Sequence, residues 1–371
     1  MNTDKRHPCD EYYDKVYGAW LGRVAGSHFG APLEFRPYSY IQRKYCAGGQ
    51  EEITGYVEPV NPDQVNDDEI YEIVGLATLE TKGIDITSED IAQAWAERLY
   101  KMQFTAEKVA LKNIRRGLMP PDCASEANGN IWYDAIGAQM KADIWGLIAP
   151  NCPQVAAHYA EIDGRVAHQG VGVEGEIFIA GVISNGFHES DVRELIHQSL
   201  ELLPPESSYR RFVEKTESIY HKHASWRSAR EEMLRKWHGI RAELRKEAAF
   251  KRRVVFLNRF LSGLHVLPNA GIITLSLLYG ADDPTDPFGR AVCLGGMMAL
   301  DTDCNCGNIG AIMGTILGAE GIPPAWKDPL QDTFHTYVKG YEHWKISELA
   351  QRICQVGRQV TAAKCPEKQM D

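Results

Sequence analysis

Apolar residues recur along most of the chain at the three- and four-residue spacing that puts them on one face of a helix. After Asp68 the pattern is carried by Ile70, Ile73, Val74 and Ala77. The same spacing predicts helices over 88–102, 155–165, 174–187 and the residues after Asn308. Ser88 is the expected N-cap of its helix. Residues 174–187 are apolar on most sides, so we expect them in the core.

Signals for β-strands are scarce, and 53–57 is the one short ambiguous piece. Helix packed on helix therefore fits better than βαβ units, and the predicted fold class is all-α. The length of 371 residues permits one large domain or two small ones. We expect a single domain over 1–371 with a helical insertion at 206–253, which is more charged and carries Trp226 and Trp237. This insertion would lie against the main body and could roof a cleft.

Charge and composition exclude some function classes. The net charge of −10 argues against a nucleic-acid-binding face, and the basic stretch 227–253 has interspersed Glu residues typical of a solvated helix. The polar residues 1–10 lack the apolar core of a signal peptide, and no apolar run reaches the length of a membrane span. Nine scattered cysteines do not resemble a disulfide framework. We expect a reduced, cytoplasmic protein with neither nucleic-acid nor membrane partners.

Two acidic segments carry the candidate chemistry. The first is Asn66-Asp67-Asp68-Glu69, at the start of a predicted helix. Asn66 and Glu69 match a capping box, in which two side chains satisfy backbone N–H groups at the helix start. Asp67 and Asp68 would then complement the positive end of the helix. Taken alone, this segment leaves capping and metal binding both open.

The second segment is Asp301-Thr302-Asp303-Cys304-Asn305, which follows an almost uncharged stretch at 291–300. Two carboxylates at the end of a buried run are costly unless something pairs them, and a hard divalent cation does so. An EF-hand loop is excluded because its sixth and twelfth positions are Cys306 and Ile312 instead of Gly and Glu. A zinc site would need a second Cys or His pair beside Cys304 and Cys306, and no G-x-S-x-G nucleophile motif is present.

Three glycines recur every four residues after this segment: Gly310, Gly314 and Gly318. Glycine inside a helix costs about 1 kcal/mol relative to alanine. Three on one face therefore predict that another backbone comes very close. Such packing would place residues 301–305, expected as a loop, at the packed centre of the fold.

Six segments, in consistent order from about Tyr13 to Trp326, resemble the ADP-ribosylglycohydrolase family of the dinitrogenase reductase-activating glycohydrolase type. They are Gly18-Ala19-Trp20-Leu21-Gly22-Arg23-Val24-Ala25-Gly26 with Gly30-Ala31-Pro32-Leu33-Glu34-Phe35, Asn66-Asp67-Asp68, Gly137-Ala138-Gln139-Met140-Lys141, Ala167-His168-Gln169-Gly170, Asp301-Thr302-Asp303-Cys304-Asn305 with Gly310-Ala311-Ile312-Met313-Gly314, and Gly321-Ile322-Pro323-Pro324-Ala325-Trp326. The resemblance implies an orthogonal all-α multi-helix bundle.

The same resemblance implies two metal ions, usually Mg²⁺, with Mn²⁺ or Ca²⁺ as alternatives. The implied metal ligands are Asn66, Asp67, Asp68, Asp301 and Asp303, the last bridging the two ions. The implied catalytic residues are Asp68, Asp303 and Glu34. The implied substrate-binding residues are His168, Gly170, Gly172, Lys141 and Asn305. The residues alone leave Lys141 as either a phosphate contact or a solvated side chain.

This chain departs from the family pattern at four positions. Asn66, Glu69 and Cys304 stand where the family has threonine, and Ser27 stands where it commonly has aspartate. The expected activity is a metal-dependent glycosidase that hydrolyses the C1′–N or C1′–O bond of an ADP-ribosyl group, with an ADP-ribosylated protein as partner. Two alternatives are a hydrolase of a small ribosylated metabolite or nucleoside and a non-catalytic ADP-ribose-binding module. A protein-linked substrate would need an open cleft, whereas a nucleoside fits a closed one.

Overall fold

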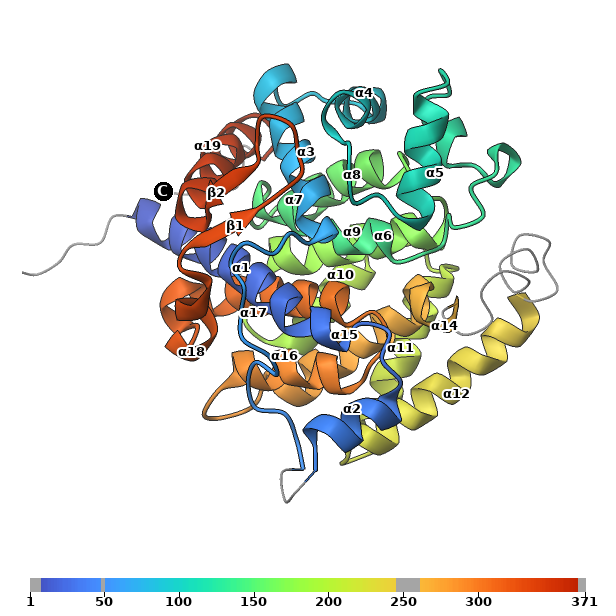
Figure 1. The fold of residues 1–371 in the computed structure, drawn as a ribbon, viewed down its shortest axis with the longest axis vertical. Coiled ribbons are helices and arrows are strands. Elements are labelled where there is room, and N and C mark those ends of the chain that lie inside the picture. Colours follow the sequence, from blue (N-terminus) through green and yellow to red (C-terminus); the bar gives the residue numbers. More distant parts are fainter. Residues whose placement is uncertain (1–7, 48–50, 245–260, 366–371) are drawn as a thin grey trace, which may run out of the picture.

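The computed structural model describes residues 8–47, 51–244 and 261–365, and its fold is all-α apart from one small hairpin (Figure 1). The helices are α1 (Pro8–Gly30), α2 (Tyr38–Tyr45), α3 (Asp67–Lys82), α4 (Ser88–Arg98), α5 (Thr105–Ile114), α6 (Gly137–Met140), α7 (Asp143–Leu147), α8 (Pro153–Gly164), α9 (Val171–Asn185), α10 (Val192–Leu200), α11 (Ser208–Tyr220), α12 (Trp226–Leu244), α14 (Leu261–Leu264), α15 (Val266–Gly280), α16 (Pro287–Met297), α17 (Thr302–Gly321), α18 (Pro324–Lys327) and α19 (Ile346–Lys364). Short 3₁₀ turns lie at η1 (Ala31–Leu33), η2 (Asp122–Ala124), η3 (Glu126–Asn128) and η4 (Asp328–Leu330). The predicted fold class is confirmed.

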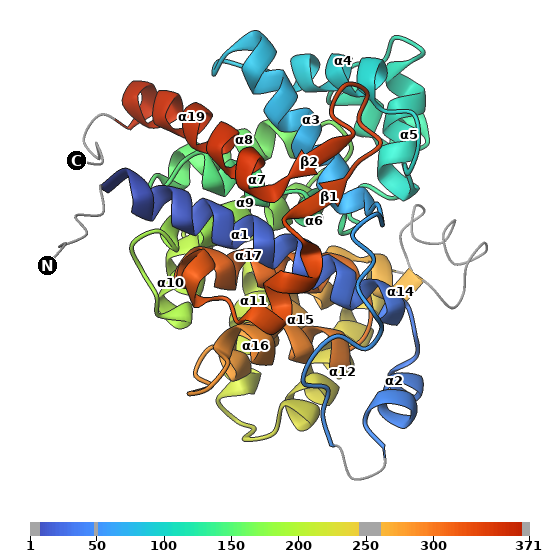
Figure 2. The same cartoon turned by 60° about the vertical axis from the view of Figure 1, so that its left-hand side comes forward.

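The two helices at the centre, α1 and α17, lie side by side through the molecule (Figure 2). A Cβ atom on Gly22 would overlap the carbonyl group of Gly310, and one on Gly18 would overlap that of Gly314. The predicted close approach of backbones is therefore confirmed, and its partner is a second glycine row in α1. Gly318 also lies against α1, because a Cβ on Gly18 would come within 2.6 Å of its carbonyl carbon, but its φ of 69° breaks the helix there.

The substitution Gly22→Ala is expected to lower the free energy of unfolding by about 1–3 kcal/mol, the usual cost of overpacking a tight contact. Gly239→Ala in α12 is the matched control, because a Cβ there meets nothing within 4 Å. It should stabilise the protein by about 0.4–1 kcal/mol by restricting the unfolded chain. Chemical denaturation of the two variants measures both effects. Equal effects would contradict the close approach of α1 and α17.

The boundary predicted at Ser88 is wrong by one residue. Thr87 caps α4, because its side chain and that of Asp90 form a reciprocal capping box. The hydroxyl of Ser88 donates instead to the backbone oxygen of Ile162 at 2.6 Å. The helix also ends at Arg98, where the sequence pattern predicted helix to residue 102.

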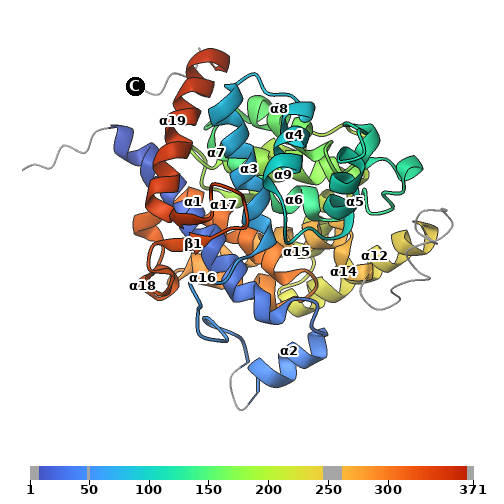
Figure 3. The same ribbon diagram turned by 45° about the horizontal axis from the view of Figure 1, so that its top comes forward.

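A short hairpin pairs β1 (Thr333–His335) with β2 (His343–Lys345) in antiparallel register. The sequence pattern does not predict these two strands. Three residues per strand are too few for an alternating pattern to be recognised. Residues 53–57, the ambiguous strand piece, form no strand. β1 lies beside α1, where Phe334 stacks on Trp20 (Figure 3), and β2 packs on α19.

The segment 206–253 is helical in its described part, which ends at residue 244 and comprises α11 and α12; residues 245–253 lie outside the described residues. These helices contribute to the core, since Tyr209, Phe212 and Trp237 are buried. The expectation of a solvated basic helix is wrong for part of α12. Arg230 is buried and donates to the backbone oxygen of Met298 at 2.7 Å.

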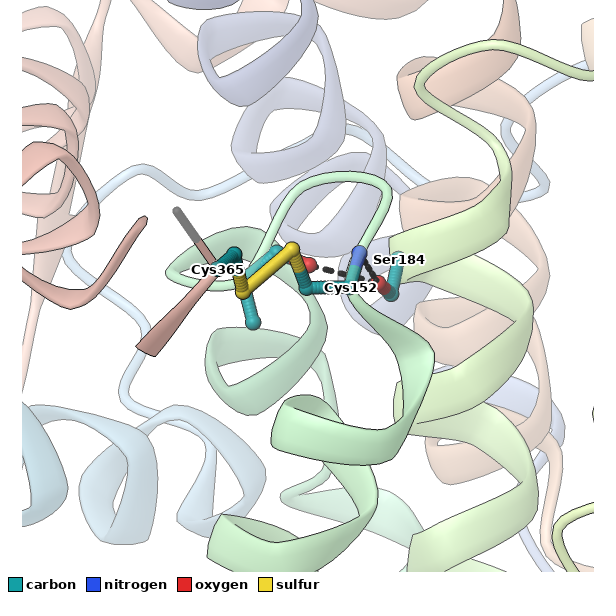
Figure 4. Close-up of a disulfide and its surroundings, with 4 residues drawn as sticks. Cys152, Ser184 and Cys365 are labelled. Carbon is teal, nitrogen blue, oxygen red and sulfur yellow. Dashed lines mark hydrogen bonds between the residues drawn. A yellow bond between two sulfur atoms is a disulfide. The ribbon is translucent and has the colours of Figure 1, made fainter. Parts of the chain in front are cut away.

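Cys152 and Cys365 form a disulfide that joins the start of α8 to the end of α19, with Cα atoms 6.5 Å apart (Figure 4). The backbone N–H of Cys152 also donates to the hydroxyl of Ser184 at 3.0 Å. The expectation that the cysteines are reduced is wrong for this pair. Within the described residues, each helix is too short or too polar to cross a lipid bilayer.

Candidate metal centre

The two acidic segments meet where α3 and α17 begin. The side-chain oxygen of Asn66 caps α3 by accepting from the N–H of Asp68 at 3.1 Å, and its amide nitrogen donates to Asp303 Oδ2 at 3.3 Å. Cys304 Sγ donates to Asp68 Oδ1 at 3.3 Å. Segments more than 230 positions apart are therefore joined by direct contacts. Two helix N-termini point their positive ends at the same group of carboxylates.

The carboxylates of the second segment are aimed by the backbone turn that leads into α17. Ala299 and Leu300 have φ values of 65° and 78°, in the left-handed region that non-glycine residues rarely adopt. The carbonyl oxygen of Leu300 accepts from the N–H of Phe35 at 3.0 Å, which fixes this turn against the segment that follows η1. The prediction of a loop over 301–305 is wrong, because α17 begins at Thr302 and Asp303 lies in its first turn.

A cavity of about 480 Å³ opens beside the junction. Its acidic lining consists of Glu34, Asp67, Glu107, Asp301 and Asp303. The remaining lining is mostly apolar and includes Phe35, Met102, Phe104, Ile136, Met140 and Leu264. The structure thus brings Glu34, Asn66, Asp67, Asp301 and Asp303 to one cavity, and their roles as ligands or catalytic residues stay predictions.

Burial and mutual repulsion oppose ionisation of these carboxyl groups. Loss of solvent, followed by the charge of Asp303, raises the pKa of Asp67 and Asp301 well above the ordinary value. The same two causes raise the pKa of Glu34 to about 8. A bound cation would reverse this, because it favours the charged form of every carboxylate beside it.

The donor set fits a hard divalent cation. Among the described residues, Oδ1 of Asp301 and Oδ1 of Asp303 are buried with no hydrogen-bond partner. Ligand atoms from Asp301, Asp303 and Cys304 lie within 4.8 Å of one another. Burial, and then Asp301, raise the pKa of the Cys304 thiol well above its usual range, so Cys304 stays a neutral donor to Asp68. Carboxylate oxygens are the ligands that Mg²⁺ and Ca²⁺ prefer.

Asp68 lies behind the cavity wall, between Cys304 and the guanidinium group of Arg23. It is fully buried, and its Oδ2 lies 3.4 Å from Arg23 Nη2. Glu69, expected to complete a capping box, also points to Arg23, at 4.0 Å. The roles of Asp68 as ligand and catalytic residue stay predictions. So does ligation by Asn66, whose oxygen already caps α3.

Lys141 lies in the core and outside the lining of this cavity. Its side chain is fully buried, with Nζ 2.6 Å from Asp163 Oδ2 and 3.3 Å from Glu176 Oε2. The interpretation of a solvated lysine is wrong, because the side chain is buried. The phosphate contact stays a prediction, although the ammonium group is already paired with two carboxylates in the core. Asn305 is also buried away from the cavity lining, where it donates to Asn269 Oδ1 at 2.8 Å.

The predicted glycine and histidine contacts lie elsewhere. Gly170 and His168 line a second cavity of about 950 Å³ beside α8, α9 and α10. Gly172 lines neither cavity and serves packing, because a Cβ there would overlap the backbone oxygen of Tyr133. His168 also faces the first cavity's wall, with Nε2 3.5 Å from Glu107 Oε1.

Sequence reasoning missed two charged residues at the site. Glu107 is buried on α5 and lines the cavity from outside both acidic segments. Arg23 is buried on α1 and holds the carboxylates behind the cavity. A signal for Arg23 was present, because it is the one charged residue in the stretch 16–27, and such a charge must be paired if it is buried. Glu107 looks like any acidic residue in the first turn of a helix.

The predicted roof over the cleft is also wrong for the described part of the insertion. Residues 206–244 contribute nothing to the lining of the carboxylate cavity. They pack instead on α15 and near α2. Residues 245–253 lie outside the described residues.

Comparisons with known proteins agree with this architecture. A structure described as an ADP-ribosylglycohydrolase-related protein complex superposes with a TM-score of 0.60 at 16% identity, over 94% of this chain and 99% of that chain. At this identity the likeness shows the fold alone. A search of curated proteins finds no match. The family model for ADP-ribosylglycohydrolases matches residues 8–362, which is nearly the whole chain, and the protein therefore belongs to the ADP-ribosylglycohydrolase family.

Proposed function

We propose that this protein hydrolyses the bond between C1′ of a ribosyl group and a nitrogen or oxygen, and that a divalent cation supports the reaction. The observation that carries the proposal is the meeting of Asp67, Asp301 and Asp303 at one cavity. Oδ1 of Asp301 and Oδ1 of Asp303 are buried there and have no hydrogen-bond partner within the described part of the chain. The family is one of glycohydrolases, so the proposed bond belongs to its chemistry. A non-catalytic binding module is disfavoured, because all the acidic groups are retained.

Asp67, Asp301 and Asp303 would hold the cation, with Mg²⁺ as the first choice and Mn²⁺ or Ca²⁺ as alternatives. When bound, it supplies positive charge that orients the ribose hydroxyl groups and lowers the pKa of water. Glu34 lines the same cavity and would accept a proton from the attacking water. The water oxygen forms the new bond to C1′, the bond to the leaving group breaks, and the leaving atom takes up a proton.

The direct test incubates the protein with ADP-ribosylated arginine and serine peptides and with nucleosides, and measures released ADP-ribose or ribose. Turnover is expected with Mg²⁺, Mn²⁺ or Ca²⁺ and not with a chelator. Turnover that survives thorough chelation would contradict the metal dependence. Absence of turnover on every substrate and every metal would favour the binding module.

Cation binding is expected to stabilise the protein more at pH 8 than at pH 6. The pKa values of Asp67 and Asp301 are raised in the folded state, so protons compete with the cation at the lower pH. Saturation to 100 times the dissociation constant would add about 2.7 kcal/mol to the free energy of unfolding. Thermal melts with Mg²⁺ and with a chelator at both pH values measure this. An equal gain at the two pH values would argue against carboxylate ligands.

A further inference from the structure

Hydrolysis of a ribosyl bond needs a proton donor for the leaving atom as well as a base for the attacking water. In the proposed function Glu34 accepts the proton of that water. The carboxylates around the cation are poor proton donors, because a bound cation favours their charged form. The donor is therefore expected at an acidic group of the cavity that lies outside the two metal segments.

Glu107 is an acidic group of the cavity lining that belongs neither to the two metal segments nor to the turn after η1. It lies in the first turn of α5 and is 2% exposed. Its Oε1 has no hydrogen-bond partner among the described residues, and its Oε2 accepts from the hydroxyl of Thr105 at 3.5 Å. A buried carboxyl oxygen of this kind needs a proton of its own or a donor from a ligand.

The surroundings of Glu107 keep its proton exchangeable near neutral pH. Burial raises the pKa of Glu107 to about 7, against the opposing effects of a backbone hydrogen bond and of the Lys141 charge. The titratable groups that act on Glu107 or feel its charge come from several elements, and they are Lys141, Asp163, His168, Asp67 and Tyr71. A carboxyl group with such a pKa carries a proton and releases it near neutral pH, as a general acid must.

His168 connects Glu107 with the second cavity. Its side chain is fully buried, and its Nε2 lies 3.5 Å from Oε1 of Glu107. The same histidine lines the cavity of about 950 Å³ beside α8, α9 and α10, whose lining also includes the exposed residues Arg165 and Glu201. Histidine takes up and gives off protons near neutral pH. The pair therefore offers a route by which a solvent proton reaches Glu107 without passing the metal carboxylates.

We propose that Glu107 is the general acid of the reaction and that His168 is a positioning residue, which acts through Glu107 by returning its proton. Glu107 gives its proton to the leaving nitrogen or oxygen as the bond to C1′ breaks, and the electron pair of that bond goes to the leaving atom. Water adds to C1′ and yields its proton to Glu34. His168 then passes a solvent proton to Glu107, and Glu34 releases its proton to solvent, so that one water is consumed. This inference rests on the proposed function and adds two residue roles to it.

The test of Glu107 uses leaving groups that differ in their need for a proton. 4-Nitrophenolate leaves an ADP-ribosyl group as a stable anion, whereas the oxygen of a serine side chain must be protonated. In Mg²⁺, Glu107→Gln is expected to lower kcat/KM for an ADP-ribosyl-serine peptide by about 100-fold, and that for 4-nitrophenyl ADP-ribose by less than about threefold. If the parent turns over nucleosides only, inosine and 4-nitrophenyl riboside take the two places.

A loss by the same factor on both substrates, or no loss on either, overturns the role of Glu107 and leaves the hydrolase function standing. A parent protein that turns over no substrate overturns the hydrolase proposal and this inference together. The readout is a ratio of two activities in one preparation, so a partly unfolded variant does not change it. Glu107→Asp, which keeps the acid at a shorter reach, should show the same split with a smaller factor.

Glu89→Gln is the matched control for Glu107→Gln. Glu89 is an acidic residue in the first turn of α4, as Glu107 is in the first turn of α5, but it is exposed and lies outside the cavity lining. This variant should leave the activity on both substrates unchanged.

The role of His168 is tested by the separate effects of His168→Gln on kcat and kcat/KM for the serine peptide. Return of the proton to Glu107 follows bond cleavage, so its loss enters kcat and not kcat/KM. The variant is expected to lower kcat about tenfold and to change kcat/KM less than about twofold. A merely structural role would lower kcat/KM as much as kcat, and that result overturns the role of His168.

Discussion

Replacing Asp303 by asparagine is expected to lower kcat/KM about a thousandfold while the protein stays folded. A cation at such a site is worth several kcal/mol to the transition state, and each 1.36 kcal/mol is a factor of ten in rate. Asp303 contributes a buried oxygen with no hydrogen-bond partner among the described residues, and it is the carboxylate whose charge most affects its acidic neighbours. Asparagine has nearly the same shape and can still accept from Asn66, whose amide lies 3.3 Å away.

Stability measurements separate a metal role of Asp303 from a structural one. In a chelator, Asp303→Asn should melt at the same temperature as the parent or higher, because the change removes one charge from a repelling group. In Mg²⁺ the parent should gain stability and the variant should gain little. Asp63→Asn is the control: it removes the same charge near α3, but Asp63 is exposed and outside the cavity lining. A variant that keeps both the Mg²⁺ gain and the activity would remove Asp303 from the site.

Local rules in the sequence predicted the elements that carry the carboxylates. The spacing of Ile70, Ile73 and Val74 predicts α3, and Asn66 does cap it. The glycine row at Gly310 and Gly314 predicts the close backbone contact that buries the start of α17. These features could be predicted because each depends on residues within a few turns of one helix.

Contacts between distant elements could not be derived in the same way. The cavity wall from α5 depends on how that helix crosses the junction, and nothing near Glu107 in the sequence signals it. Lys141 shows the opposite error: its segment matches the family, but the sequence does not reveal that Asp163 and Glu176 neutralise it in the core. The left-handed turn at Ala299 and Leu300 could not be predicted from the sequence either, because neither residue type favours positive φ.

Arg23→Met is expected to lower the free energy of unfolding by about 3–5 kcal/mol, the cost of leaving buried charges without their partner. The Arg23 side chain is 1% exposed, and its nitrogens lie 3.4 Å from Asp68, 3.4 Å from Glu72 and 3.2 Å from Asp143. Methionine fills much of the volume, so packing changes less than charge. Arg193→Met is the control, because that arginine pairs with Asp282 at 3.3 Å on the surface, where such pairs contribute at most about 1 kcal/mol.

The destabilisation by Arg23→Met should grow as pH rises from about 5 to 8. Burial raises the pKa of Glu72 and Asp68 well above the ordinary value and that of Asp143 to about 6, while Arg23 acts against these shifts. Without Arg23 the folded pKa values rise further, so the folded state binds more protons than the unfolded state, and stability falls with pH in that window. Denaturation of the variant at several pH values, with and without Glu72→Gln, measures this. A pH-independent loss that Glu72→Gln does not reduce would mean that Arg23 acts through packing and not through charge.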